Sequence, residues 1–191
     1  MKPSKVSRQY TVAVIGDARA EPDSVKYKLA QDCGALLMEK GFTVVTGGLG
    51  GVMEAASRGA RESDAWTSGR VVALLPGSDP TEANSWADVV VPTSLDHLRN
   101  AVVAQSDAVI AIGGGAGTLS EMAFAWIHRR LIVGLRVDGW SGQLADQCID
   151  NRTRYRDIDD DKVFGADGAA EAVSIVVNKV GKYILRHQSI R

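Results

Sequence analysis

Six short apolar segments rich in β-branched residues recur along the chain, and none of them alternates apolar with polar positions. They span residues 11–15, 43–46, 71–75, 89–91, 108–112 and 131–135. A strand with this pattern is buried on both faces, which happens when helices cover both sides of a parallel sheet. The segments therefore predict six strands of a mainly parallel sheet.

Segments with the period of an amphipathic helix separate these strands. Apolar stripes run through residues 25–37 and 98–103, and a closing stripe of Ala and Val runs through 172–184. Residues suited to cap or end a helix flank the first two stripes: Asp23, Ser24, Gly41 and Ser94. The alternation predicts an α/β fold, namely a Rossmann-like, doubly wound, mainly parallel sheet with helices on both faces.

The length of 191 residues suits one domain with one hydrophobic core. We predict a flexible N-terminal tail over residues 1–10, a single Rossmann-like domain over 11–185, and a C-terminal tail over 186–191. The region 138–167 is rich in Asp, Arg and Gly and has a helical period only over 143–149. We expect it to be a surface connection around one short helix, with a mobile flap as the alternative.

The charge balance bears on the class of partner. The chain has 22 basic and 23 acidic side chains and a formal net charge of −1, so it has no overall attraction to polyanions. Its longest purely apolar stretches are about five residues, far below the roughly 20 that span a bilayer. We expect no nucleic-acid partner, no membrane association and a cytoplasmic location.

Cysteine and histidine are few and scattered, at Cys33, Cys148, His97, His128 and His187. Their spacing suits neither a disulfide framework nor a zinc site. The acidic run at 159–161 has the character of a solvated turn. We therefore predict no metal site and no catalytic metal.

Two glycine-rich segments share a pattern and a position. Residues 47–54 (GGLGGVME) follow one predicted strand, residues 113–121 (GGGAGTLSE) follow another, and aligned they share Gly-Gly-x-Gly-x-x-x-Glu before a helix. Glycine lets backbone amides approach an anion, and the following helix adds positive potential at its N-terminus. The pattern predicts a phosphate site, principally at the second loop, with these candidate binding residues: Gly47, Gly48, Gly50, Gly51, Gly114, Gly115, Ala116, Gly117 and Thr118.

Other roles for the loops stay open. Tight strand-to-helix turns in any α/β fold use glycine, so either loop could be purely structural, the first more readily than the second. A nucleoside-triphosphate P-loop requires a lysine that neither loop contains. A dinucleotide fingerprint requires a third glycine in register, which both loops lack, although Asp138 does follow the next strand. NAD(P) binding is therefore a weak competitor.

Arg99, Asn100 and Glu121 complete the candidate site. Arg99 and Asn100 lie in the helix that leads to the second loop, where a guanidinium could make a forked, charge-assisted contact with phosphate. The alternative is an ordinary surface arginine. Glu121 lies in the first turns of the helix after the loop, where a carboxylate stabilises a helix N-terminus. Because it would repel phosphate, a functional Glu121 should face sugar hydroxyls or a leaving group.

Several motifs together resemble one group of Rossmann-like proteins. They are Arg99-Asn100, the segment 106–111 running into GGGAGTLSE, and TGGLGGVMEAA at 46–56. Over about residues 10–180 the chain resembles molybdenum cofactor carrier proteins and bacterial relatives often labelled lysine decarboxylase-like. Nothing marks the Schiff-base lysine that a pyridoxal decarboxylase needs, so that label is set aside.

A more distant resemblance is to the Lonely Guy family of cytokinin-activating phosphoribohydrolases. Its signature, Pro-Gly-Gly-x-Gly-Thr-x-x-Glu preceded by Arg-Lys, is matched here by Gly114, Gly115, Gly117, Thr118, Glu121 and Arg99. Two positions depart from it, because Gly113 replaces the proline and Asn100 replaces the lysine. The departures put the hydrolase function in doubt, whereas Arg99 and Glu121 match the family's catalytic pair.

Two functions follow from these resemblances. The favoured one is a non-catalytic storage or carrier protein for a phosphorylated heterocycle, the molybdenum cofactor with its pterin phosphate. The alternative is a nucleoside 5'-monophosphate phosphoribohydrolase, in which Arg99 and the second loop hold the phosphate and Glu121 acts on the ribose. A pure scaffold ranks last, since it leaves both loops unexplained. The resemblance, together with Trp126 and Ile127 as expected apolar surface, also predicts a homo-oligomer, a dimer or a tetramer.

Overall fold

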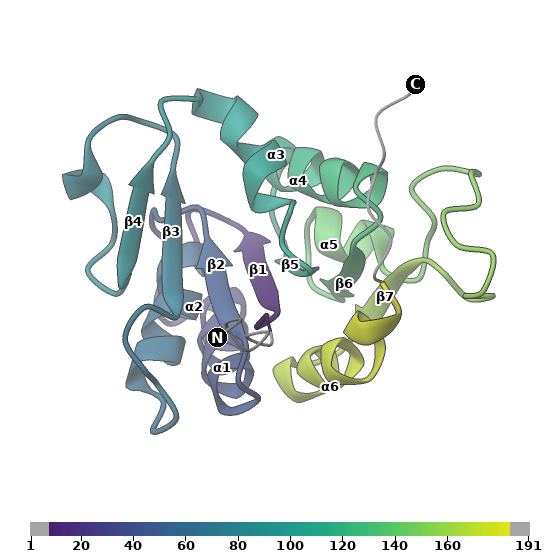
Figure 1. The fold of residues 1–191 in the computed structure, drawn as a ribbon, viewed down its shortest axis with the longest axis horizontal. Helices are drawn as coiled ribbons and strands as arrows, with labels where there is room; N and C mark the ends of the chain where they lie inside the picture. Colours follow the sequence, from purple (N-terminus) through teal and green to yellow (C-terminus); the bar gives the residue numbers. More distant parts are fainter. Residues whose placement is uncertain (1–7, 184–191) are drawn as a thin grey trace, which may run out of the picture.

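Seven strands form a single sheet in the computed structural model, which describes residues 8–183 (Figure 1). The strands are β1 (Thr11–Gly16), β2 (Thr43–Thr46), β3 (Val71–Leu75), β4 (Val89–Pro92), β5 (Ala108–Ile112), β6 (Leu131–Leu135) and β7 (Val163–Ala166). The α-helices are α1 (Val25–Glu39), α2 (Val52–Glu62), α3 (Arg99–Val103), α4 (Ala116–Ile127), α5 (Trp140–Leu144) and α6 (Ala169–Lys179). Short 3-10 turns are η1 (Pro80–Glu82), η2 (Asp96–Leu98) and η3 (Val180–Lys182). Most of the two predicted tails, and Ile184, fall outside the described residues.

The order of strands creates one reversal in the sheet. All pairs are parallel and the order is β4-β3-β2-β1-β5-β6-β7. The chain winds outward from β1 to β4 and then returns to the other side of β1 with β5, where Gly16 pairs with Ile112. The loops that follow β1 and β5 therefore leave the same edge side by side. Open α/β sheets bind ligands at such a reversal.

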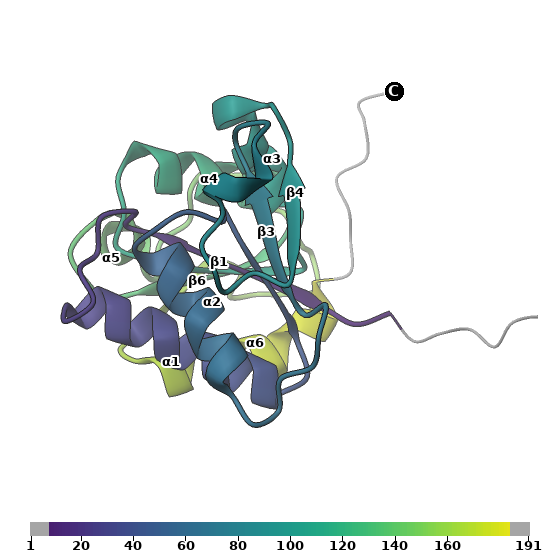
Figure 2. The ribbon, with the colours of Figure 1, turned by 90° about the vertical axis from the view of Figure 1, so that its left-hand side faces the viewer.

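Helices cover both faces of the sheet, as the strand pattern predicts. Helices α1, α2 and α6 lie on one face and α3, α4 and α5 on the other (Figures 1 and 2). In β5, Ile110 and Ile112 pack into the core under the first layer, whereas Val109 and Ala111 pack into the core under the second. Both sets are fully buried, which is why the strand shows no alternation. None of the helices within residues 8–183 is long and apolar enough to cross a membrane.

Glycines let the backbones of α1 and α2 approach each other closely. A Cβ at Gly34 would lie 2.0 Å from the Ala56 carbonyl oxygen, and one at Gly59 would lie 1.9 Å from the Gln31 carbonyl oxygen. Helix α1 begins at the predicted cap, because the Ser24 hydroxyl accepts a hydrogen bond from the backbone N–H of Tyr27 at 3.2 Å.

The predictions for Ser94 and for the region 138–167 are wrong. Ser94 does not cap a helix: its φ is +56°, it precedes η2, and Leu98 of the predicted apolar stripe is 69% exposed. The region 138–167 is more than a connection, because it contains β7, whose four residues are all buried. The strand escapes notice in the sequence because it is short and follows the acidic run and Lys162. The helix of this region spans Trp140–Leu144 rather than 143–149.

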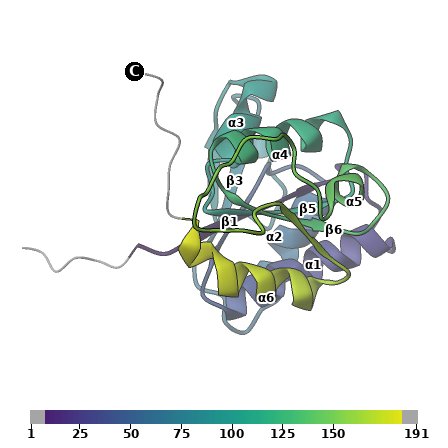
Figure 3. The same cartoon turned by 90° about the vertical axis from the view of Figure 1, so that its right-hand side faces the viewer.

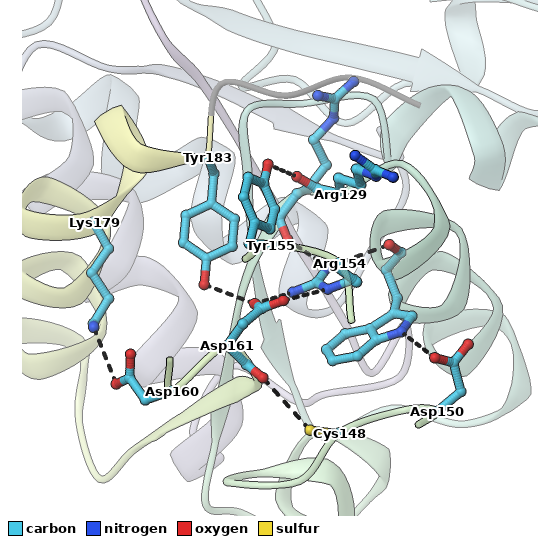
Figure 4. A network of polar contacts seen from close by, with 11 residues as sticks. Arg129, Cys148, Asp150, Arg154, Tyr155, Asp160, Asp161, Lys179 and Tyr183 are labelled. Atoms are coloured by element: carbon cyan, nitrogen blue, oxygen red, sulfur yellow. Dashed lines mark hydrogen bonds and ion pairs between the residues drawn. The ribbon is translucent and has the colours of Figure 1, made fainter. Parts of the chain in front are cut away.

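The long segment between α5 and β7 runs along the side of the domain that faces the viewer in Figure 3. A buried arginine on it, Arg154, holds it against the body of the domain. Arg154 donates from Nε and Nη2 to the two Asp161 carboxylate oxygens at 2.9 and 2.5 Å, and Asp161 also accepts from the Tyr183 hydroxyl at 2.9 Å (Figure 4). Nη1 of Arg154 donates to the carbonyl oxygens of Trp126 and Arg130. These contacts favour a fixed segment over the flap alternative.

Candidate functional site

A cavity of about 270 Å³ opens where the sheet reverses, between the ends of β1 and β5. Parts of β1, both glycine loops, η2, α3 and α4 supply its lining: Ile15, Gly16, Asp17, Ala18, Leu49, Met53, His97, Arg99, Asn100, Gly115, Gly117, Thr118 and Glu121. The structure thus brings together, in one cavity, six of the predicted site residues from α3 and the second loop. The glycines of the first loop are absent from this lining, although their neighbours Leu49 and Met53 belong to it.

The second loop is anchored at its start and open at its end. Gly113 and Gly114 have φ of +65° and +87°, and the Gly113 N–H donates to the Ser141 hydroxyl at 2.7 Å. A Cβ at Gly114 would lie 2.1 Å from Thr118 Oγ1, which itself donates to the Gly16 carbonyl oxygen at 3.1 Å. At Gly115 and Gly117, by contrast, an added Cβ meets no atom of residues 8–183 within 4 Å. The open glycines face the cavity at the N-terminus of α4.

The N-terminus of α4 makes this end of the cavity positive. The first N–H groups of an α-helix have no partner within the helix, and the helix dipole adds about half a positive charge there. Gly115 is the N-cap, and no side chain in the described part of the chain caps the helix. Backbone N–H groups beside open glycines can therefore donate to the oxygens of an anion.

In the first loop, glycine allows close packing against the backbone of another part of the protein. A Cβ at Gly51, whose φ is +62°, would lie 2.3 Å from the Asp17 carbonyl oxygen, which accepts from the Val52 N–H at 3.0 Å. Asn84 Nδ2 donates to the carbonyl oxygens of Gly48 and Leu49, both at 3.1 Å. The N-terminus of α2 is thus directed at backbone of the β1 loop, and the first loop is a packed turn.

Arg99 lies between the two loops and pairs with Glu121. Its Nη1 is 3.3 Å from Glu121 Oε1, and each residue is only 7% exposed. A Cβ at Gly47 would lie 2.5 Å from Arg99 Nη1, so the first loop leaves room for the guanidinium. The Nε of Arg99 is buried and has no hydrogen-bond partner among the described residues. A buried, unpaired N–H of a charged group is costly, and a bound anion would satisfy it.

Burial shifts the pKa values of Arg99 and Glu121 in opposite directions. Desolvation raises the pKa of the Glu121 carboxyl to about 7, against the opposing effect of the Arg99 charge. Desolvation likewise lowers the pKa of Arg99, which Glu121 counteracts. Near neutral pH, Glu121 therefore exchanges between its neutral and ionised forms while Arg99 stays charged. In the neutral form it does not repel an anion beside it.

Asn100 ties α3 to α4. Its Nδ2 donates to the Ser120 hydroxyl at 2.8 Å, and it is 5% exposed at the cavity wall. The Ser120 hydroxyl in turn donates to the Gly117 carbonyl oxygen at 2.7 Å. Asn100, which stands where the Lonely Guy family has a lysine, thus supports the second loop. Because asparagine is uncharged, the buried cation of the cavity is Arg99.

Several residues of this site were not predicted from the sequence. Asp17 lines the cavity directly after β1, Asn84 braces the first loop, and Ser141 braces the second. The position of Asp17 could have been found, because it follows the strand at which the sheet reverses. Asn84 and Ser141 lie far from the loops in sequence and carry no local signal.

Comparisons with known proteins agree with this architecture. The model of the SLOG cluster4 family matches residues 9–173. An uncharacterized protein of Archaeoglobus fulgidus is 40% identical over 126 residues, which are 65% of this chain and 79% of that protein. A cytokinin riboside 5'-monophosphate phosphoribohydrolase of Mycobacterium marinum is 30% identical over 161 residues, which are 76% of this chain and 84% of that enzyme.

A solved structure is similar over nearly the whole chain. The molybdenum cofactor binding protein from the phototrophic bacterium Rippkaea orientalis superposes with a TM-score of 0.74 and is 28% identical, covering 91% of this chain and 98% of that one. Both resemblances drawn from the sequence are therefore confirmed, and so is the Rossmann-like fold.

Proposed function

The chain belongs to the SLOG cluster4 family, and from this premise we propose that it binds a phosphorylated heterocycle, the molybdenum cofactor with its pterin phosphate, as a storage or carrier protein. One observation carries the proposal. Arg99, which is buried and whose Nε has no hydrogen-bond partner within residues 8–183, lines the same cavity as the open glycines of the α4 N-terminus. The similarity to the cofactor binding protein of Rippkaea orientalis supports the choice of ligand.

Magnitudes explain why the ligand should have a ring as well as a phosphate. A helix N-terminus contributes about 0.3–2 kcal/mol to an anion, whereas micromolar affinity requires about 8 kcal/mol. The cavity offers an apolar wall of Ile15, Leu49 and Met53 for a flat ring. Burial of a ring there and the charge-assisted contact of Arg99 would supply the remainder.

Two free thiols, Cys33 and Cys148, suit the cytoplasmic location that we also propose.

Native mass spectrometry of gently purified protein tests the proposal. Expressed in a bacterium that makes the molybdenum cofactor, the wild type should retain a ligand with the mass of the pterin phosphate. Arg99→Ala should lose it, and Arg156→Ala, which removes an exposed arginine outside the cavity, should keep it. Retention of the same ligand by Arg99→Ala would contradict the proposed site.

A hydrolase is the second candidate, favoured by the buried pair of Arg99 and Glu121 and by the similarity to the Mycobacterium marinum enzyme. In that function Arg99 would hold the 5'-phosphate, and Glu121 would stabilise the developing oxocarbenium charge or activate water. As a carrier, the wild type should release no base from AMP. Sustained release that is lost in both Glu121→Gln and Arg99→Ala would establish the hydrolase.

We also propose a homo-oligomer, although one residue used to predict it does not belong to the surface. Trp126 is 3% exposed because it packs into the second core, with the Arg154 guanidinium 3.6 Å from its ring centroid. Exposed apolar residues on η2, α3 and α4 support the proposal instead: Leu98, Val102 and Ile127. Light scattering should report a dimer or tetramer at micromolar concentration, and a 20.3 kDa monomer would contradict it.

A further inference from the structure

Asp17 places a fixed carboxylate in the cavity. It follows β1 directly, lines the cavity, and its side chain is 33% exposed. Oδ1 accepts the Arg19 backbone N–H at 3.0 Å, and Oδ2 accepts a hydrogen bond from Lys26 Nζ at 3.1 Å. These two contacts hold the carboxylate in place from both sides. Each oxygen has a second lone pair, so both can still accept a bond from a ligand.

The carboxylate gives the cavity two chemically different regions. The backbone hydrogen bond from Arg19, with help from Lys26, lowers the pKa of Asp17 below its usual range. An ionised carboxylate accepts hydrogen bonds and donates none, so it cannot hydrogen-bond to phosphate oxygens, and the two negative charges repel each other. The phosphate therefore belongs with Arg99, Gly115 and Gly117, and Asp17 is left for a part of the ligand that carries N–H or O–H donors.

The geometry of a carboxylate selects among donors. Its two oxygens match two parallel N–H groups in one plane, as in the bidentate pairing with arginine. A cyclic guanidine edge, a ring N–H beside an exocyclic amino group, presents the same pair of donors. Guanine and pterin both have this 2-amino-4-oxo edge and adenine does not. The apolar wall of Leu49 and Met53 in the same cavity suits the flat ring that carries it.

We propose that Asp17 is a specificity-determining residue, whose two carboxylate oxygens accept hydrogen bonds from the cyclic guanidine edge of a 2-amino-4-oxo heterocycle, while the phosphate of the same ligand is held at the α4 N-terminus and Arg99. The inference rests on the proposed function, since it assumes that the cavity binds a phosphorylated heterocycle. It assigns a guanine-like or pterin-like ring to the ligand and disfavours an adenine-type ring.

Calorimetric titration with three commercial phosphates tests the inference. GMP has both donors of the edge, AMP lacks the edge, and ribose 5-phosphate lacks the base. Wild type should bind GMP at least about tenfold more tightly than AMP, because a site built to accept hydrogen bonds rejects an analogue that cannot donate them. Asp17→Asn should lose most of that preference and should bind ribose 5-phosphate within about twofold of wild type.

The control variant is Asp23→Asn. Asp23→Asn removes an exposed carboxylate from the same segment, outside the cavity, and should keep the preference for GMP. Equal affinity of wild type for GMP and AMP, or an unchanged preference in Asp17→Asn, would overturn the role of Asp17 and leave the proposed function standing. Failure of wild type to bind any of the three phosphates would overturn the phosphate site and the inference together.

Discussion

The two glycine loops share a sequence pattern and a place in the fold, yet they do different work. In the first loop a Cβ at Gly51 would meet the Asp17 carbonyl oxygen at 2.3 Å, and the α2 N-terminus donates to that same oxygen through Val52. In the second loop Gly115 and Gly117 have open space beside them at the α4 N-terminus. Glycine thus serves close packing in one loop and leaves open space at the cavity in the other, and only the surroundings distinguish the two cases.

The largest expected effect is on stability, at the first loop. In Gly51→Ala the new Cβ meets backbone that cannot move aside, at a φ of +62° that side chains rarely adopt. We expect the free energy of unfolding to fall by about 3 kcal/mol, measured by urea denaturation. Gly181→Ala, where a Cβ meets nothing within 4 Å, should change it by less than about 0.5 kcal/mol. A Gly51→Ala protein as stable as wild type would show that this loop is loosely packed.

Asn84→Ala should weaken the same loop by a smaller amount. It removes the two side-chain hydrogen bonds to the carbonyl oxygens of Gly48 and Leu49. The expected loss in unfolding free energy is about 1–2 kcal/mol, since Gly48 keeps its bond from the Asn84 backbone N–H. Asn178→Ala, which removes an exposed asparagine from α6, should be nearly neutral. Equal effects of the two substitutions would mean that Asn84 does not brace the loop.

Gly115→Val should affect binding rather than folding. Its Cβ enters open space, so the unfolding free energy should stay within about 1 kcal/mol of wild type, while the branched side chain covers the amides that an anion must approach. We expect at least about a tenfold loss of affinity for a phosphorylated ligand, or about 1.4 kcal/mol, by calorimetry. Gly50→Val in the first loop should leave the affinity nearly unchanged. If Gly50→Val lost affinity equally, both loops would contact the phosphate.

The sequence predicts the sheet well because strand burial is a local signal. Four of the six predicted segments have the same bounds as observed strands, and the other two observed strands are each longer by one residue, Gly16 and Pro92. Strand β7 was missed because Val163–Ala166 is short and follows charged residues. The surface position of Trp126 was wrong because Arg154, 28 residues further along the chain, covers it. The different uses of the two loops depend likewise on Asp17 and Asn84, whose proximity to the first loop arises only from the fold.

The smallest expected effect is that of Glu121→Gln, which removes the charge of the side chain and keeps its shape. Glu121→Gln keeps the side-chain volume, so a carrier should lose or gain no more than about 1 kcal/mol in binding at neutral pH. Because burial raises the pKa of Glu121 to about 7, the folded protein holds this proton more tightly than the unfolded chain does. Wild-type stability should therefore fall, relative to Glu121→Gln, as pH rises from about 4.5 through about 7, and level off above it.

The ionisation of Glu121 should also change ligand affinity, because Glu121 lies beside the proposed anion site at Arg99 and the second loop. Below pH 7 the neutral Glu121 leaves the Arg99 charge to the anion, whereas above it the ionised carboxylate competes for Arg99 and repels the phosphate. The affinity of wild type relative to Glu121→Gln should thus decline with rising pH, and taking this ratio cancels the titration of the ligand's own phosphate. A ratio that stays constant between pH 5.5 and 8.5 would place the anion away from Glu121, and with it away from the open end of the second loop.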